Sequence, residues 1–257
     1  MKKYFVLLLV GLLVLSLSGL ATAQELTGND VLENVEESIS ADTAQITFSM
    51  ELHDGDRVRN RKLETYTMDG PDYDKGKVRF LEPASVEGTG FLTRDPHDSD
   101  DDDMYLYMPA VGSVRRIAGS DKNNSFVGTD FSYNDLSLLG GANYDDDYDA
   151  TIIEENDEEY LLEIIPTDEE IEYSYGKMWV QKSNWFPTKV EFYDEDEELY
   201  KVLENEDIKE IDGYWTAGQM TMSDVQDDTK TVLYLEEIIY DEQLDPRLFT
   251  TRNLQRY

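Results

Sequence analysis

The sequence predicts a mainly β protein in which one antiparallel sheet curls into a barrel or half-barrel around a packed interior. From Thr43 onward, apolar residues alternate with polar ones, as they do in half-buried strands. About a dozen such segments are joined by short polar connections, and a sheet of that width must curl or close. Several segments are apolar on both faces, which a flat sheet with one face in water does not need.

A short helix is expected before the first strand. Thr27 can cap it, with Asp30 three residues later as an approximate capping box. Apolar residues then repeat at helical spacing through Val31, Leu32, Val35 and Ile39. The period changes to two at Thr43, where Ile46, Phe48, Met50 and Leu52 define one face of the first strand. Asp54-Gly55 is typical of a hairpin turn.

The remaining strands are expected in two series with short polar connections. They cover residues 57–68, 76–81, 88–93, 104–108 and 114–118, then 148–153, 160–165, 172–181, 188–193, 199–203, 213–222 and 229–240. No linker or fixed-period repeat divides the chain, so we expect one domain over residues 24–257. Residues 121–141 break the alternation by mixing Gly, Asn and Ser with aromatic residues. They form either a lid over a cavity or an ordinary excursion that packs on the core.

The first 23 residues have the pattern of a secretory signal peptide. Lys2 and Lys3 precede an apolar run over residues 5–17, and Ala21-Thr22-Ala23 is a cleavage site of small residues. An uncleaved anchor is the alternative, but the apolar run is short for a membrane span. We therefore expect cleavage after Ala23 and a soluble, periplasmic mature protein. We also expect it to be a monomer.

Composition excludes several classes of function. The chain has 57 acidic and 22 basic residues and a net charge of -35, which excludes a basic nucleic-acid site and disfavours docking on anionic lipid heads. It has no Cys, which excludes disulfides, thiolate metal sites and Cys nucleophiles. With only two His residues, a His-based zinc site or a His-dependent triad is disfavoured. We expect no cofactor and no metal.

The acidic runs have two interpretations. Acids cluster at residues 100–103, 145–147, 157–159 and 194–198, and such a surface suits a salty environment, where its self-repulsion is screened. Calcium binding is the alternative. An EF-hand loop needs a Gly at its sixth position, and neither residues 98–104 nor residues 143–149 supply one. The first interpretation is therefore favoured.

Two runs resemble the signature of LolA-like outer-membrane lipoprotein-sorting proteins. The first is Leu106-Tyr107-Met108-Pro109-Ala110-Val111-Gly112-Ser113-Val114-Arg115-Arg116-Ile117-Ala118. The second is Ser125-Phe126-Val127-Gly128-Thr129-Asp130-Phe131-Ser132-Tyr133-Asn134-Asp135-Leu136. Supporting pieces are Phe80-Leu81-Glu82-Pro83, residues 88–92 and Trp185-Phe186-Pro187. The resemblance covers residues 26–240.

The resemblance implies a curved, incomplete antiparallel β-barrel, with an N-terminal helix and a helix or loop lid over an apolar cavity. It implies a carrier of lipid or lipoprotein acyl chains, with an inner-membrane exporter and an outer-membrane acceptor as partners. We expect the cavity and lid to be lined by Ile46, Phe48, Met50, Phe91, Leu106, Met178, Val180, Phe126, Phe131 and Leu136.

The resemblance also implies a lid that is latched by an arginine, but no motif places that residue here. Arg115 and Arg116 are structural residues in salt bridges with nearby acids, or one of them pairs with Asp130 or Asp135 to hold the lid.

Two other classes of function stay open. A scaffold protein for a membrane exporter would share the fold but have a filled interior. A glycoside hydrolase with an acid pair is disfavoured because the sequence offers many carboxylates and no spacing that selects two of them. Motifs of other hydrolases and of P-loop enzymes do not occur in the sequence.

The charge predicts how stability depends on salt. Cleavage of the leader removes two Lys and no acid, so the mature chain carries -37. Molar salt shortens the Debye length to about 3 Å and screens this self-repulsion. We expect the thermal midpoint to rise from dilute buffer to molar sodium chloride. A midpoint that does not change with salt would show that the acids are paired or bind specific cations.

Overall fold

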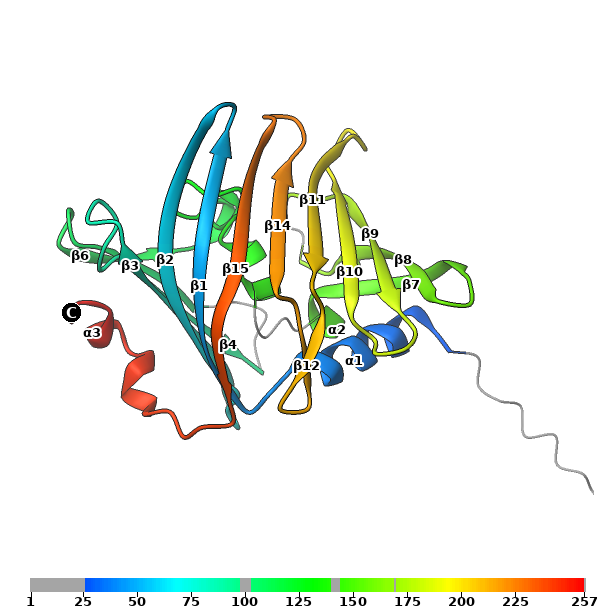
Figure 1. The fold of residues 1–257 in the computed structure, drawn as a ribbon, viewed down its shortest axis with the longest axis horizontal. Coiled ribbons are helices and arrows are strands. Elements are labelled where there is room, and N and C mark those ends of the chain that lie inside the picture. Colours follow the sequence, from blue (N-terminus) through cyan, green and yellow to red (C-terminus); the bar gives the residue numbers. More distant parts are fainter. Residues whose placement is uncertain (1–25, 98–102, 140–143, 169, 257) are drawn as a thin grey trace, which may run out of the picture.

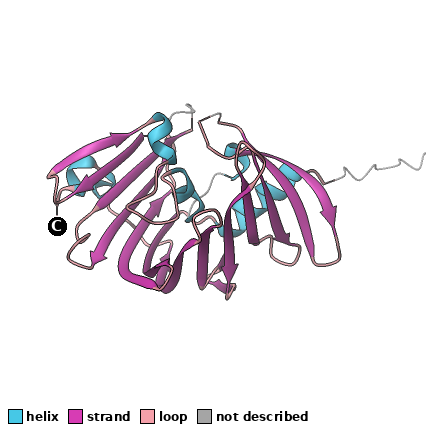
Figure 2. Cartoon of the chain, turned by 90° about the horizontal axis from the view of Figure 1, so that it is seen from above, coloured by secondary structure: helices cyan, strands magenta, loops and turns pink. Residues whose placement is uncertain are grey.

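The computed structural model describes residues 26–97, 103–139, 144–168 and 170–256. The predicted leader lies outside the described residues. Thirteen strands form one antiparallel sheet in the order β6-β5-β4-β3-β2-β1-β15-β14-β11-β10-β9-β8-β7. The sheet is strongly curved and is not closed into a barrel (Figures 1 and 2). The predicted fold class is confirmed.

Two meanders meet at the centre of the sheet. The first comprises β1 (Thr43–Asp54), β2 (Arg57–Met68), β3 (Tyr73–Glu82), β4 (Gly90–Pro96), β5 (Asp103–Met108) and β6 (Ser113–Ile117). The second comprises β7 (Tyr148–Glu155), β8 (Glu159–Pro166), β9 (Tyr175–Gln181), β10 (Pro187–Tyr193), β11 (Leu199–Glu206), β14 (Gln219–Asp224) and β15 (Thr229–Tyr240). They are joined by β1 and β15, which pair from Ala44 opposite Tyr240 to Asp54 opposite Thr229.

The N-terminal helix α1 (Gly28–Ile39) forms as the sequence predicts. Thr27 accepts a hydrogen bond from the Asp30 amide, and Asp30 accepts one from the Thr27 amide, which completes the capping box. Val31, Leu32 and Val35 of the apolar stripe of α1 are completely buried in the main core, and Ile39 is partly buried against it. Gly28 lies so close to β7 that an added Cβ would stand 2.3 Å from the Ala150 carbonyl oxygen. A glycine is therefore required at this contact.

The main core lies on the concave face of the sheet. Alternate residues of the strands point to this face and form one cluster with α1, with Tyr144 of the short helix α2 (Tyr144–Asp147) and with the segment after β6. That segment contains the 3₁₀ helices η1 (Gly119–Asn123) and η2 (Asn134–Leu139). Its residues 119–136, here called the lid, cover the concave face, as expected for this region.

The C-terminal residues cover the convex face over the first meander, a feature that the sequence did not predict. Phe249 of the 3₁₀ helix η3 (Pro246–Phe249) and Leu254 of α3 (Thr251–Leu254) are buried against Leu92, with Tyr105 and Tyr107 packed around them. This second cluster explains why β4 and β5 are apolar on both faces. The segment 246–256 is called the C-terminal strap below.

Cations on β3 and β4 fix the backbone of the strap. Arg79 donates to the Asn253 and Leu254 carbonyl oxygens at 3.1 and 3.0 Å, and Arg94 donates to the Phe249 carbonyl oxygen at 2.9 Å. Carbonyl groups at the end of a short helix lack the full set of intrahelical partners, so these bonds help to satisfy them. Figure 1 shows the strap beside the edge of the sheet that ends in β6.

One predicted strand is wrong. Residues 213–222 do not form a continuous strand, because β13 (Tyr214–Thr216) pairs with β12 (Lys209–Ile211) in a small separate hairpin before β14 begins. Gly218 marks the break. Its amide donates to the Glu206 and Asp207 carbonyl oxygens, and an added Cβ would lie 2.9 Å from the Asp207 side chain. The predicted strand 172–181 also begins later, at Tyr175.

Within the described residues, no helix is both long enough and apolar enough to cross a membrane.

The strap gives a prediction about stability. Phe249 is 2 % exposed, so Phe249→Ala should lower the free energy of unfolding by about 3–5 kcal/mol, the usual cost of emptying an aromatic core position. Urea denaturation of the mature protein measures this. Val225→Ala, at an exposed turn position, is the control and should change it by less than about 0.5 kcal/mol. Equal stability of the two variants would show that the strap does not contribute to the fold.

Candidate functional site

The structure brings the predicted lining residues together on the concave face. Nine of them are at most 6 % exposed, and Leu136 is partly buried against the same cluster. They come from strands of both meanders and from the lid. The set is Ile46, Phe48, Met50, Phe91, Leu106, Phe126, Phe131, Leu136, Met178 and Val180.

Aromatic side chains of the lid fill the space above the first meander. The Phe126 ring lies 5.7 Å from Phe80, 5.4 Å from Phe91 and 5.6 Å from Tyr133, measured between ring centroids. Phe131 is also buried, at 1 % exposure. Tilted and edge-on aromatic pairs at these distances are attractive. In this conformation, therefore, side chains of the lid fill the concave face above the first meander.

The lid turns back on itself at Val127-Gly128, where both residues have positive φ angles of 53° and 74°. The left-handed region costs a β-branched residue roughly 1–2 kcal/mol. Arg61 of β2 supports the turn by donating to the Val127 carbonyl oxygen at 2.9 Å, while its guanidinium lies 5.4 Å from the centroid of Phe80. Burial and then the nearby charge of Arg59 lower the pKa of Arg61 to about 10.

Asp130 fastens the middle of the lid to β15. Its carboxylate accepts hydrogen bonds from the hydroxyl groups of Thr229 and Thr231, and its amide donates to the Thr231 hydroxyl at 3.0 Å. Thr231 is completely buried. Because β-branched threonines hold one side-chain rotamer, this contact fixes the position of the lid along β15.

Asp135 fastens the end of the lid to the second meander. Its carboxylate accepts from the Tyr173 hydroxyl at 2.7 Å and lies 3.2 Å from the Lys201 ammonium of β11. Lys201 also lies 3.6 Å from Glu172. The side chain of Lys201 is 5 % exposed and that of Asp135 is 1 % exposed, so Lys201 and Asp135 form a buried salt bridge. We call Asp135, Lys201, Tyr173 and Glu172 the ionic cluster.

The pKa values in the ionic cluster are displaced in directions that follow from burial and charge. Burial alone would lower the pKa of Lys201, but Asp135 and Glu172 outweigh it and raise that pKa above its ordinary value. Burial raises the pKa of Glu172, although Lys201 opposes the shift. Burial and then Asp135 raise the pKa of Tyr173 well above its ordinary value. Lys201 is therefore charged and Tyr173 is protonated at neutral pH.

Of the two roles considered for Arg115 and Arg116, the structure shows a salt bridge with a nearby acid for Arg116, which lies 3.3 Å from Asp103 on the neighbouring strand. Arg115, one residue earlier and thus on the opposite face, lies near Tyr133 of the lid, where its charge opposes the rise that burial gives to the pKa of Tyr133. Both aspartates have the other partners described above. Adjacent strand residues point to opposite faces, so at most one of the two arginines can face the lid.

Sequence reasoning missed Arg61. One signal was available, because Arg57, Arg59 and Arg61 alternate along the face of β2 that continues with the buried Leu63. A cation that continues an inward-facing row needs a partner on that side of the sheet. Lys201 carried a similar signal between Tyr200 and Val202, but its partner could not be deduced from local sequence.

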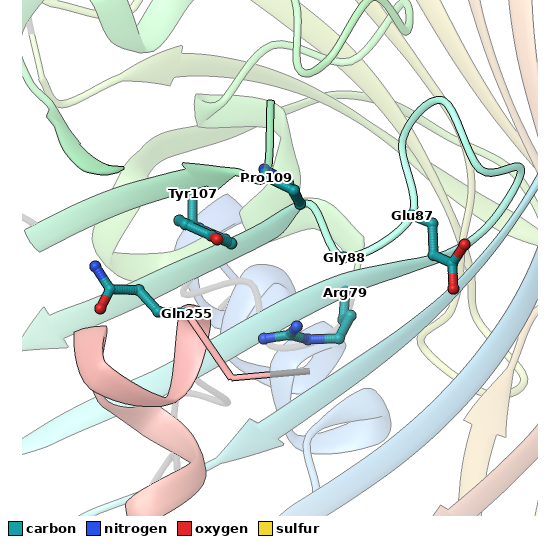
Figure 3. Close-up of a pocket in the computed structure, with 6 residues that line it drawn as sticks. All are labelled: Arg79, Glu87, Gly88, Tyr107, Pro109 and Gln255. Carbon is teal, nitrogen blue, oxygen red and sulfur yellow. The ribbon is translucent and has the colours of Figure 1, made fainter. Parts of the chain in front are cut away.

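Two pockets lie outside the filled interior. One, of about 270 Å³, opens beside the lid and is mostly polar; its lining includes Arg59, Thr129, Asp130, Lys201 and Asp224. The other, of about 260 Å³, lies on the convex face beside the strap (Figure 3). It is lined by Arg79, Glu87, Gly88, Tyr107, Pro109 and Gln255. Within the described residues, no group of His, Asp or Glu is arranged to hold a metal ion.

Comparisons with known proteins identify the family. A family model described as "Uncharacterized protein" matches residues 72–256. A domain from Vibrio parahaemolyticus described as an outer membrane lipoprotein-sorting protein is 28% identical, with a TM-score of 0.80 over 89% of this chain and 98% of its own. The chain belongs to the family that this model describes, and the LolA-like resemblance seen in its sequence is confirmed.

Two further solved structures share this fold. A DUF1329 family protein from Desulfovibrio piger ATCC 29098 is 29% identical, with a TM-score of 0.82 over 88% of this chain and 97% of its own. A LolA superfamily protein from Nitrosomonas europaea shares the fold at 24% identity, with a TM-score of 0.70 over 87% of this chain and 97% of its own. No curated protein matches the sequence.

The ionic cluster of this LolA-like chain gives a prediction. Lys201→Met leaves Asp135 buried without a counter-charge and should lower the free energy of unfolding by about 3–5 kcal/mol. The double variant Lys201→Met/Asp135→Asn removes both charges and should lose less than the sum of the single variants. Urea denaturation of the four proteins measures the coupling. Additive losses would contradict a direct interaction.

The same variant should change the pH dependence of stability. Without Lys201, the already raised pKa of Glu172 rises further. The folded state then binds the Glu172 proton more tightly than the unfolded state does, so stability must increase as pH falls. Relative to the parent, Lys201→Met should recover stability as the pH is lowered from neutral towards the ordinary Glu value of 4.5. Parallel pH profiles of the two proteins would contradict this.

Proposed function

We propose that the protein is an exported, non-catalytic carrier that holds lipid or lipoprotein acyl chains between the concave sheet and the lid. In this proposal it moves them through the periplasm towards the outer membrane. One observation carries the proposal. The lid buries its aromatic side chains in the concave face, and polar contacts at Val127, Asp130 and Asp135 also hold it to the sheet.

This arrangement allows an acyl chain to replace the aromatic side chains of the lid on the concave face. If the lid moves away, Phe126 and Phe131 leave an apolar surface that is lined by both meanders. An acyl chain that enters there gains roughly 0.8 kcal/mol for each CH₂ removed from water. A chain of ordinary length can therefore compensate for the lost aromatic contacts. The cargo then needs no charged contact to be retained.

The polar contacts between the lid and the sheet contribute to the free energy that is needed to open the lid. Arg61 is the residue that we propose as the principal latch, because it alone joins β2 to the strained turn of the lid. Opening releases the strain at Val127 and so offsets part of the lost hydrogen bond. Asp130 and Asp135 hold the lid to β15 and β11, on the other side of the sheet centre. The lid is thus tied across the junction of the two meanders.

A scaffold protein with a filled interior is the second candidate. The observation that favours it is the near-complete burial of the concave side chains in this conformation. A scaffold needs no lid movement, whereas a carrier does. The two candidates therefore differ in one measurable property, which is uptake of an apolar ligand by the folded protein.

Mass spectrometry of lipid extracted from the purified mature protein tests the carrier directly. Phe131→Asp and Phe48→Asp place a charge in the proposed cavity and should abolish lipid retention while the circular dichroism of the sheet persists. Leu248→Asp places the same charge on the convex face and is the matched control, which should keep its lipid. If the parent protein carries no lipid and takes up no fluorescent fatty acid, the scaffold is favoured.

A reversible lock on the lid supplies a second test, which the absence of natural Cys makes clean. Asp130→Cys/Thr231→Cys joins two positions that are in hydrogen-bond contact. Oxidised protein should exclude a fluorescent fatty acid, and reduction should restore uptake. Ser223→Cys/Lys230→Cys joins paired residues of β14 and β15 and should take up ligand in both states. Uptake by the oxidised lid variant would show that the lid does not gate the cavity.

A further inference from the structure

The hairpin between β5 and β6 ends in an exposed apolar tip that the lid and the core do not use. Residues 108–113, Met108-Pro109-Ala110-Val111-Gly112-Ser113, are all exposed and carry no charge. Val111 is 63 % exposed, more than the other large exposed apolar residues of the described chain, and Met108 is 36 % exposed. These residues belong to the first signature run, in which Leu106 and Ile117 are buried in the core.

The charge around this tip differs from that of the rest of the molecule. Residues 104–120 contain no Asp or Glu and include Arg115 and Arg116. Residues 246–257 likewise contain no acid and include Arg247, Arg252 and Arg256. Two of the nearest acids pair with arginines of these segments, Asp103 at the other end of β5 with Arg116 and Asp245 with Arg247, and Glu87 lines the pocket beside the strap.

These two acid-free segments lie side by side. Tyr107 and Pro109 of the hairpin line the convex-face pocket together with Gln255 of the strap (Figure 3). The neighbouring residues Arg252 and Arg256 are exposed. The fold therefore gathers an apolar tip and exposed cations at one end of a chain whose net charge is -35. We call this end the docking end.

We propose that the docking end binds a phospholipid bilayer surface, with Val111 and Met108 entering the interface and the exposed arginines facing the phosphate layer. Loops and helices that bind bilayer interfaces combine these two features. Every strongly acidic face of the protein is repelled by an anionic bilayer, so this end is the one that can approach. The negative net charge disfavours lipid binding by most of the surface. By repelling the acidic faces, it turns the docking end towards the bilayer.

The shape of the docking end favours a bilayer over a protein partner. A stable protein interface buries about 800 Å² on each partner, and a six-residue protruding tip offers much less than that. A narrow convex tip can still insert into a soft surface. Full burial of Val111 and Met108 would contribute roughly 1.5–3 kcal/mol each, which gives weak, reversible attachment. A carrier that must leave the membrane again requires attachment of that kind.

Salt distinguishes this docking from that of a simple basic patch. A basic patch binds an anionic bilayer more weakly as salt rises, because salt screens the attraction between its cations and the lipid phosphates. Here the long-range force from the whole chain is repulsive, and molar salt removes it while leaving apolar insertion in place. Binding to anionic vesicles should therefore strengthen from dilute buffer to molar salt.

Flotation with vesicles tests the proposal on the mature protein after lipid has been stripped from it. The probes are phosphatidylethanolamine–phosphatidylglycerol vesicles and pure phosphatidylcholine vesicles. We expect Val111→Asp to weaken partition into both about tenfold. Val225→Asp, at a turn position that is 47 % exposed, is the matched control and should bind like the parent. Arg252→Glu/Arg256→Glu should weaken binding to the anionic vesicles more than to phosphatidylcholine.

Three results would overturn the proposal. The first is no binding to either vesicle at any salt concentration. The second is equal loss from Val111→Asp and from Val58→Asp, an exposed residue at the tip of the β1–β2 hairpin, because the docking end would then not be special. The third is binding that falls steadily with salt in the manner of a basic patch. Because no cargo is present, these results are independent of the carrier proposal.

Discussion

A single curved sheet with two apolar faces needs two separate covers, and the rest of this structure follows from that constraint. The pairing of β1 with β15 joins two meanders into one wide sheet, so neither face can be buried by closing the sheet on itself. The concave face is covered by α1 and the lid, and the convex face of the first meander is covered by the strap. Besides apolar burial, cations of the sheet contact the lid and the strap, where they reach backbone carbonyl oxygens or carboxylates.

The two covers differ in the strength of their attachment. The strap is anchored by Phe249 and Leu254, and Arg79 and Arg94 bind backbone atoms that any sequence would present. The lid depends on side chains with strict requirements, because the buried pair of Asp135 and Lys201 is favourable only while both partners are in place. A buried ion pair contributes little net stability but penalises every other position of the lid. That combination suits a cover with two discrete positions.

The local features could be predicted from sequence, and the long-range partners could not. Period two from Thr43, the capping box at Thr27 and the signature loop over residues 125–136 led to the correct sheet and helix and to the segment that covers the concave face. Pairing of β1 with β15 depends on residues about two hundred positions apart. The hairpin at residues 209–216 was hidden because β12, β13 and β14 also alternate, and only the packing of Gly218 on Asp207 separates them. Arg61 and Lys201 were visible as inward-facing cations without visible partners.

The strand β6 connects the docking end directly to the lid. The strand runs from the exposed tip at Gly112 to the buried Ile117, and the lid begins two residues later. Arg115, in the middle of β6, lies near Tyr133 of the lid and acts on the pKa of that residue through its charge. A force on the tip at a bilayer surface therefore reaches the lid through five residues of one edge strand, which is paired on one side only. If both proposals hold, the fold places the release of the lid next to the membrane that receives the cargo.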